Sequence, residues 1–513
     1  MSLQDPTTFT LEGKDCDYSD AALPDTNGTS PKTHKGVYFF GALAALGGAS
    51  GGFDMGIIGG IMGSMELFNE RFLGDESERP YRSGLFVSLM LLGATIGGLS
   101  SGTLCASWAF ALGCVFETIG YNFALILVGR LCVGLGQGSL TNAVPLYHAE
   151  IAPPAIRGRL ITLYSAASSM GVVLGYFVTF GTSNIDNDWS WRIPFLINLV
   201  LCLVISFAFV LPFSPRWLID KDRLDEARQV IAKLYQLDIE HPAVTQEFGI
   251  IFSEIQHERA FGNRTYLELF RGTNLRRTAY AFFVGNGAAF TGSAAIVYYS
   301  PQIMQQAGLS EIGISLVASG ACNIVSFIFT VLSMTYIDLL GRKLALGTGA
   351  FIMAATMFVM GGLFQGYNTV LDDQGNVGLW NVSARNCVIT LIFIFQASYA
   401  YSWGPVGYIY PAEIMNQRTR AKGMALAYGF NWPVALLFTF VVPIFMANTI
   451  YGGYYFFAGT CTLLFIGHFF IPETKGYSLE QIDRMFNPLP ELATDTMDAP
   501  SIETKQLPSM QAV

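Results

Sequence analysis

Two oppositely charged residues lie inside stretches of the sequence that are otherwise apolar. Asp54 occurs in the segment 51–56 (GGFDMG), and Arg130 lies within the apolar segment 123–146. A carboxylate in such surroundings is costly unless it is paired, protonated or facing a cavity, and Arg130 is its natural partner. A buried carboxylate beside an arginine can exchange a proton when its surroundings open to water. The alternative is a fixed structural ion pair.

A second group of charged residues lies at the ends of apolar segments. The turn 338–343 (DLLGRK) contributes Asp338, Arg342 and Lys343, whose cations can pair with Asp338 and with Glu413. Such a charge lattice holds only while that end of a helical bundle is closed, so breaking it would allow the opposite opening. The alternative is plain anchoring by positive residues at the cytoplasmic face.

A glutamate followed at a fixed spacing by an arginine occurs twice in the chain. An Ala-Glu-Ile triplet is followed, seven residues after its glutamate, by an arginine: Arg157 follows Glu150, and Arg420 follows Glu413. Two related halves describe a six-plus-six helical transporter with its site between the halves. The predicted gating charges are Glu150, Arg157, Arg159, Asp338, Arg342, Lys343, Glu413 and Arg420.

Other kinds of chemistry find no support in the residue pattern. The sequence shows no metal-ligand cluster, nucleophile triad or phosphate-binding loop, and its five histidines are scattered. The eight cysteines form no Cys-x-x-Cys pair, and most lie in apolar runs, where they act as small apolar residues. We therefore expect no metal, no cofactor and no enzymatic activity.

The elements that position these residues follow from composition. Hydrophobic residues make up 52% of the 513 residues and charged residues only 13%, against about 25% charged residues in a soluble domain. So few charges cannot cover a soluble surface, which predicts an all-α membrane protein of many spans in a lipid bilayer. The net charge of −9 argues against a nucleic-acid partner.

Eleven segments are apolar over about 20 residues, the length that crosses a bilayer. They are 38–64, 84–104, 123–146, 160–181, 193–213, 278–300, 313–336, 343–365, 386–410, 421–446 and 451–471. A shorter stretch at 106–121 makes twelve.

The longest polar segment, 214–277, is rich in Lys and Arg and therefore faces the cytoplasm. We expect a disordered cytoplasmic tail (1–36), a six-helix bundle (37–213), a cytoplasmic helical linker (214–277), a second six-helix bundle (278–472) and a cytoplasmic tail (473–513). The glycosylation sequon at Asn381 would face outward, whereas those at Asn27 and Asn263 would be cytoplasmic and unused.

Over roughly 36–485 the chain resembles the sugar-porter family of the major facilitator superfamily, in its fungal branch. The resemblance rests on an ordered series of motifs: 52–54 (GFD), 129–138 (GRLCVGLGQG), 145–153 (PLYHAEIAP), 157–159 (RGR), 214–218 (SPRWL), 298–301 (YYSP), 338–343 (DLLGRK), 403–405 (WGP), 411–413 (PAE) and 472–476 (PETKG). It implies two pseudo-symmetric six-helix bundles around a central site. It also implies that Asp54 and Arg130 couple transport to a proton.

The implied binding site departs from the family pattern. At the family's amide positions in the seventh span stand Ala288, Ala289 and Ala294, and Ser165 replaces a glutamine of the fifth span. Amides suit vicinal hydroxyls because each both donates and accepts, so the pocket should be more apolar than a hexose site. The remaining candidate ligands are Ser165, Asn286, Thr291, Ser293, Tyr298, Tyr299, Asn323, Trp403, Tyr408, Asn431 and Trp432. Each on its own is more often a packing residue.

The third span is the second departure. The family's charged loop before it is absent, since 102–110 (GTLCASWAF) carries no charge. The 18 residues 104–121 span about 27 Å, less than a hydrocarbon core of about 30 Å. We expect a short or defective third helix, a looser cytoplasmic gate, and Glu117 without an evident partner. A real deletion and a faulty gene model both explain this.

The sequence thus predicts a plasma-membrane transporter of a sugar or related polyol that works by alternating access, by proton symport. Its partners would be a small-molecule substrate, a proton and the lipid bilayer. The alternatives are a transporter of a less polar organic solute, such as a carboxylate or secondary metabolite, and a sugar sensor that does not transport. The short segment after residue 488 disfavours a sensor.

Overall fold

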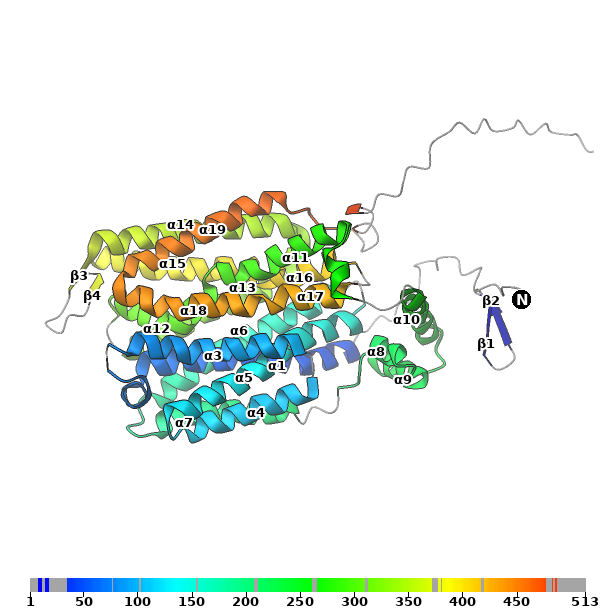
Figure 1. Ribbon diagram of the computed structural model, residues 1–513, viewed down its shortest axis with the longest axis horizontal. Helices are drawn as coiled ribbons and strands as arrows, with labels where there is room; N and C mark the ends of the chain where they lie inside the picture. The colour runs from blue at the N-terminus through cyan, green and yellow to red at the C-terminus, as the bar shows by residue number, and fades with distance from the viewer. Residues whose placement is uncertain are drawn as a thin grey trace, which may run out of the picture.

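The computed structural model is a bundle of long helices that run along its longest axis (Figure 1). The structure describes residues 8–11, 14–17, 35–75, 77–100, 103–153, 156–206, 211–260, 265–309, 312–370, 377–379, 381–416, 419–476, 482 and 485–486. Within these residues, ten helical segments are long and apolar enough to cross a membrane. Helices α3 and α4, described next, bring the number of rods in the bundle to twelve.

The N-terminal half contributes six rods. They are α1 (Lys35–Ser64), α3 (Arg79–Ser100), α4 (Thr103–Ile119), α5 (Phe123–Ile151), α6 (Arg157–Thr182) and α7 (Trp189–Ser206). The short elements α2 (Glu66–Phe68) and η1 (Asn69–Leu73) follow α1. Helix α4 has only 17 residues, about 26 Å at the rise of an α-helix. The prediction of a short third helix is therefore confirmed.

The C-terminal half also contributes six rods, and three of them are interrupted. They consist of α11 (Thr273–Phe290) with α12 (Ser293–Gln306), α13 (Ile312–Leu340), α14 (Arg342–Tyr367), α15 (Val382–Tyr401) with α16 (Trp403–Ile414), α17 (Arg420–Gly429) with α18 (Asn431–Asn448), and α19 (Ile450–Gly467), which ends in η3 (His468–Phe470). The break between α11 and α12 falls at Gly292, whose φ of 79° is left-handed and suits glycine.

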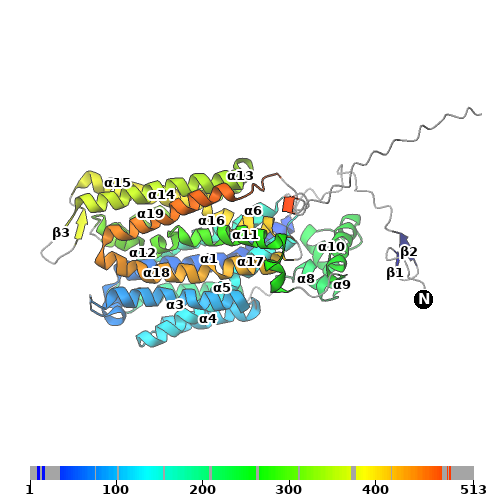
Figure 2. The same ribbon diagram turned by 45° about the horizontal axis from the view of Figure 1, so that its top comes forward.

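A small helical cluster lies beside one end of the bundle (Figure 2). It comprises α8 (Pro215–Asp220), α9 (Leu224–Tyr235) and α10 (Pro242–Ala260), and η2 (Tyr266–Phe270) follows it in the chain. Helix α8 begins where the Ser214 side chain accepts a hydrogen bond from the Trp217 amide, with Pro215 in the first turn, as N-terminal capping requires. Leu218, Ile231 and Val244 share the apolar core of this cluster.

Two hairpins lie outside the rods. Strands β1 (Thr8–Leu11) and β2 (Lys14–Asp17) pair antiparallel within the segment that we expected to be a disordered tail. The remainder of 1–34 lies outside the described residues. Strands β3 (Asn368–Val370) and β4 (Val377–Leu379) pair between α14 and α15, at the end of the bundle opposite the linker helices (Figure 1).

Candidate functional site

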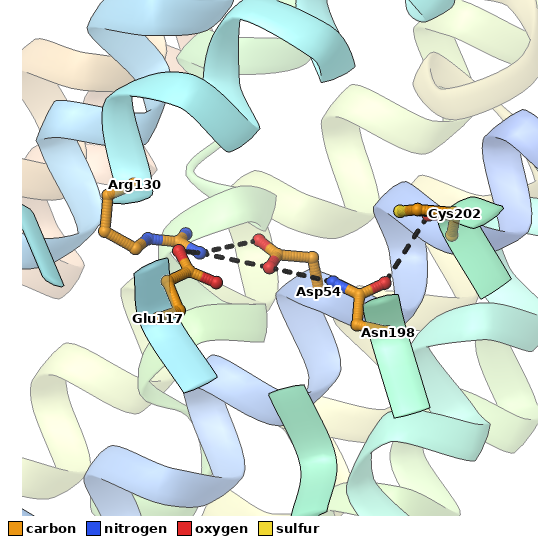
Figure 3. Close-up of polar contacts among 6 residues, drawn as sticks. Asp54, Glu117, Arg130, Asn198 and Cys202 are labelled. Carbon is orange, nitrogen blue, oxygen red and sulfur yellow. Dashed lines mark hydrogen bonds and ion pairs between the residues drawn. The ribbon is translucent and has the colours of Figure 1, made fainter. Parts of the chain in front are cut away.

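The two charged residues singled out by the sequence meet inside the N-terminal half (Figure 3). Nη1 of Arg130, on α5, donates to both carboxylate oxygens of Asp54, on α1, at 3.0 and 2.9 Å. Neither side chain exposes any surface. The predicted pairing of Asp54 with Arg130 is thus confirmed.

Glu117 is a third member of this site, and the expectation that it lacks a partner is wrong. Its Oε1 accepts a hydrogen bond from the same Nη1 of Arg130 at 3.2 Å, and its side chain is fully buried. Glycine makes the approach possible: a Cβ at Gly129 would lie 2.8 Å from Cγ of Glu117. The available signal was that a charged residue in an apolar run needs a compensating partner.

A polar chain continues from Asp54 toward α7. The Asn198 amide donates to Oδ1 of Asp54 at 3.3 Å, and the Ser50 hydroxyl donates to Oδ1 of Asn198 at 3.4 Å. Ser50 also contacts the sulfur of Cys202 at 3.1 Å. Sequence reasoning missed these residues because each is an ordinary helix-packing polar residue on its own.

A cavity of about 200 Å³ lies between the two halves. Seven of the predicted ligands line it: Ser165, Ser293, Tyr298, Asn323, Tyr408, Asn431 and Trp432. The alanines at the family's amide positions, Ala288, Ala289 and Ala294, line it as well. The replacement of the family's amides by alanines therefore places methyl groups on the cavity wall.

Four predicted ligands do not line this cavity: three of them bond between helices, and Thr291 bonds at the end of its own helix α11. Asn286 donates to the Ala427 carbonyl at 3.1 Å, and Thr291 donates to the Ala288 carbonyl at 2.7 Å. The hydroxyl of Tyr299 donates to the Thr439 carbonyl at 3.2 Å. Nε1 of the fully buried Trp403 donates to the carbonyl of Leu346 at 3.0 Å. We correct Asn286, Tyr299 and Trp403 from wall residues to residues that brace the bundle, and Thr291 to a residue that bonds within its own helix.

Several polar residues of the wall were missed. They are Gln137, Thr141, Tyr164, Ser168, Ser169, Ser326, Thr330, Gln396, Tyr399 and Tyr428. Gln137 and Gln396 both carry amides, which restores part of the hydrogen-bonding capacity that the alanines remove. The signal that could have found Gln137 is a long polar side chain among Gly134, Gly136 and Gly138 within an apolar span, where it needs a polar partner or a cavity.

Tyr298 connects the cavity with the charged site. It lines the cavity and interacts electrostatically with Arg130 and Asp54. Its hydroxyl has no hydrogen-bond partner among the described residues.

The charges at the linker end of the C-terminal half form a compact network. Nη2 of Arg342 pairs with Oε1 of Glu413 at 2.7 Å, as expected, and the Thr474 hydroxyl donates to Oε2 of Glu413 at 2.7 Å. Glu473, which the sequence analysis missed, accepts the backbone N–H groups of Arg342 and Lys343 at 3.0 Å each. A carboxylate at these N–H groups caps the start of α14.

The remaining predicted gating charges are placed less centrally. The Lys343 ammonium donates to the Phe469 carbonyl at 2.9 Å. Glu150 interacts with the Ser214 hydroxyl and with the charge of Arg216. Arg159 is exposed, and Arg420 is half-buried at the start of α17. The side chains of Arg157 and Asp338 lie outside the described residues.

Asn381 begins α15, and its side-chain oxygen accepts the backbone N–H groups of Ser383 and Ala384. Its glycosylation stays a prediction, and Asn27 and Asn263 lie outside the described residues. Among the described residues, no group of three or more His, Cys, Asp or Glu side chains is placed to hold a metal ion.

Comparison with known proteins identifies the family. The family model described as "Sugar (and other) transporter" matches residues 40–486. The chain belongs to this sugar transporter family. It is 32% identical over 481 residues to the MFS glucose transporter mfs1 of Aspergillus flavus, covering 88% of this chain and 90% of that one. It is 30% identical to the low-affinity glucose transporter HXT1 of Saccharomyces cerevisiae, and the match covers 89% of this chain and 83% of that one.

Other similar proteins extend this comparison. The MFS-type transporter criB of Aspergillus cristatus is 31% identical and covers 87% of this chain and 92% of that one. The structure of the proton:xylose symporter XylE bound to 6-bromo-6-deoxy-D-glucose superposes with a TM-score of 0.74 at 24% identity, covering 88% of this chain and 99% of that one. The expected fold, a major-facilitator bundle of two six-helix halves, is confirmed. The chain is an integral, multi-pass membrane transporter.

The Arg342–Glu413 pair of this transporter should behave as a coupled unit. We expect Arg342→Gln and Glu413→Gln each to lower stability by about 1.5–3 kcal/mol, because each leaves a charged partner in a partly buried place. The double variant should be little worse than either single one. Thermal unfolding in detergent measures this cycle.

The matched control is the exposed Arg223–Glu226 pair of the linker, whose coupling should be much weaker because solvent screens it. Additive losses at Arg342 and Glu413 would show that the two residues act separately.

Proposed function

We propose that this chain is a plasma-membrane proton symporter for a sugar or a related polyol. The observation that carries the proposal is a buried acid–base site on α1 and α5 beside a cavity that both halves line. Protonation of Asp54 would weaken its hold on Arg130, and Tyr298 would transmit that change to the cavity. Family membership and the glucose-transporter relatives support the substrate class.

Alternating access requires that the halves close at one end at a time. At the end away from the linker, Nε2 of Gln305 on α12 donates to the Gly63 carbonyl of α1 at 2.9 Å. The Tyr176 hydroxyl of α6 donates to the Val297 carbonyl of α12 in the same region. These contacts support a closed outer end, with the linker and the predicted gating charges at the cytoplasmic end.

Uptake of labelled sugars in yeast that lacks its own hexose transporters tests the proposal. The expected result is saturable uptake of a hexose, pentose or polyol, with alkalinisation of the medium when the sugar is added. Uptake by itself excludes a sensor that does not transport. Failure to take up any of these sugars would defeat the assigned substrate class.

A transporter of a less polar organic solute is the second candidate, because Ala288, Ala289 and Ala294 present methyl groups to the cavity. Uptake of an apolar carboxylate or secondary metabolite, with no uptake of sugars, would favour it. The Gln137 and Gln396 amides on the same wall keep a sugar as the first candidate.

Replacing Ala288 with glutamine should restore an amide to the wall. If the substrate is a sugar, we expect the half-saturating concentration for glucose to fall about two- to tenfold, the range of one added hydrogen bond of 0.5–1.5 kcal/mol. Initial rates of labelled glucose uptake measure it. The control is Gly459→Ala, because nothing lies within 4 Å of the added Cβ. Ala350→Gln would not serve as a control, because Ala350 is fully buried. Weaker glucose uptake by Ala288→Gln would favour the less polar solute.

A further inference from the structure

The buried site holds one more acid than its single arginine can neutralise. Asp54, Glu117 and Arg130 are each fully buried, so with both acids ionised the cluster would carry a net negative charge in a low-dielectric interior. We propose that Glu117 is a second proton-carrying residue: the resting site holds one proton between Asp54 and Glu117, and Glu117 becomes the partner of Arg130 when Asp54 carries that proton. The expected effect of Glu117 on transport rests on the proposed proton symport, whereas the shared proton itself does not.

The hydrogen-bond geometry shows the competition directly. Three carboxylate oxygens converge on Nη1 of Arg130, two from Asp54 at 3.0 and 2.9 Å and one from Glu117 at 3.2 Å. An –NH2 group of a guanidinium has only two hydrogens to donate. Nε and Nη2 of Arg130 and Oε2 of Glu117 have no hydrogen-bond partner among the described residues. Both acids are therefore directed at one donor group that cannot serve them equally (Figure 3).

Among the described residues, no second cation pairs with Asp54 or Glu117. The titratable groups of the described residues that interact with the cluster from the neighbouring helices are Cys114, Cys132 and Tyr298. Thiols and phenols are predominantly neutral at physiological pH and cannot supply a positive charge. An uncompensated buried carboxylate is costly, so taking up one proton is the remaining route to a neutral cluster.

Packing holds Glu117 and Arg130 in this arrangement. Helices α4 and α5 approach closely through Gly113 and Gly129, where added Cβ atoms would lie 2.5 Å from the Val133 amide nitrogen and 2.8 Å from Cγ of Glu117. The Arg130 guanidinium lies over the Phe86 ring at 5.2 Å, which favours a fixed cation. The arginine can therefore change its carboxylate partner by small rotations without leaving the site.

The chemical step is a proton transfer alone. The proton that the two acids share moves from Glu117 to a carboxylate oxygen of Asp54, which becomes neutral, and the ionised Glu117 then neutralises Arg130. Without Glu117, protonation of Asp54 would leave an unpaired guanidinium in the bundle. Glu117 thus makes the proton-loaded state electrically neutral and easier to reach.

Whether the buried cluster holds a proton can be measured without any substrate. In the full-length protein in lipid at neutral pH, infrared spectroscopy should show the carbonyl stretch of a buried protonated carboxyl. We expect Glu117→Gln to remove that contribution, because Asp54 is then left ionised with Arg130 alone. Glu66→Gln, at an exposed position outside the site, is the control and should change nothing. An unchanged band in Glu117→Gln would overturn the proposal.

Transport gives the second measurement. Because Glu117→Gln removes the negative charge that favours a proton on Asp54, the pH of half-maximal uptake should move to the acid side by about one unit, a tenfold change in proton affinity. Glu117→Asp should stay near the wild-type pH. If Glu117→Gln yields no folded protein, Glu117→Leu supplies an uncharged side chain for the same comparison. An unshifted profile would overturn the role of Glu117, whereas a wild-type protein that causes no alkalinisation would instead refute proton symport.

Discussion

Asp54→Asn is expected to abolish uphill accumulation while leaving exchange of labelled for unlabelled substrate intact. Asparagine keeps the shape of the side chain and one oxygen for Arg130 but cannot bind the transported proton. Arg130 retains Glu117, at 3.2 Å, as a charged partner, so the bundle should still fold. We expect substrate to equilibrate across the membrane without concentrating, and the alkalinisation signal to disappear.

The measurements are the accumulation ratio and the external pH in cells that express each variant. Asp188→Asn is the control, since Asp188 is a half-exposed carboxylate that pairs with Arg71 outside the buried site. Alkalinisation that survives in Asp54→Asn would show that the Asp54–Arg130 pair is structural and that coupling lies elsewhere.

Arg130→Gln should have the largest effect on the folded protein. It leaves Asp54 and Glu117 buried together with no cation. Breaking a buried pair by removing one partner costs about 3–5 kcal/mol, a large part of the stability of a typical protein. We expect little folded protein, a lowered thermal midpoint in detergent, and no coupled transport.

A triple variant separates charge from shape in this experiment. Arg130→Gln combined with Asp54→Asn and Glu117→Gln carries no buried charge, so it should recover folding but not proton coupling. A thermal midpoint of Arg130→Gln equal to that of the wild type would contradict the argument that the cluster depends on its single cation.

At the charged site, the cost of a single charge in an apolar segment was enough to predict one pairing. Asp54 and Arg130 are rare charges in apolar runs, and the high cost of such charges in lipid makes pairing between them the simplest expectation. Glu117 obeys the same rule, yet its partner was missed. Its pairing depends on how closely α4 approaches α5 through Gly113 and Gly129, and that distance is a property of the packed bundle.

The residues that line the cavity could be predicted only in part. Ser165, Tyr298 and Asn323 line it as predicted, whereas Thr291 bonds within its own helix and Trp403 bonds the neighbouring α14. The break at Gly292 resets the helical phase between α11 and α12, and a similar break precedes Trp403. The candidates were carried over from the family pattern, which does not specify how each helix segment is rotated about its axis in this chain.

The sequence by itself determined that the chain spans a membrane with two related helical halves, that the third helix is short, and that Asp54 needs Arg130. These follow from hydropathy, segment length and the cost of isolated charge, which act locally along the chain. Only the tertiary structure decided that Arg130 serves two acids and which polar side chains reach the cavity. Both depend on interhelical distance and on rotation about helix axes, because a shift of a single residue around a helix moves a side chain from a cavity to a packed interface.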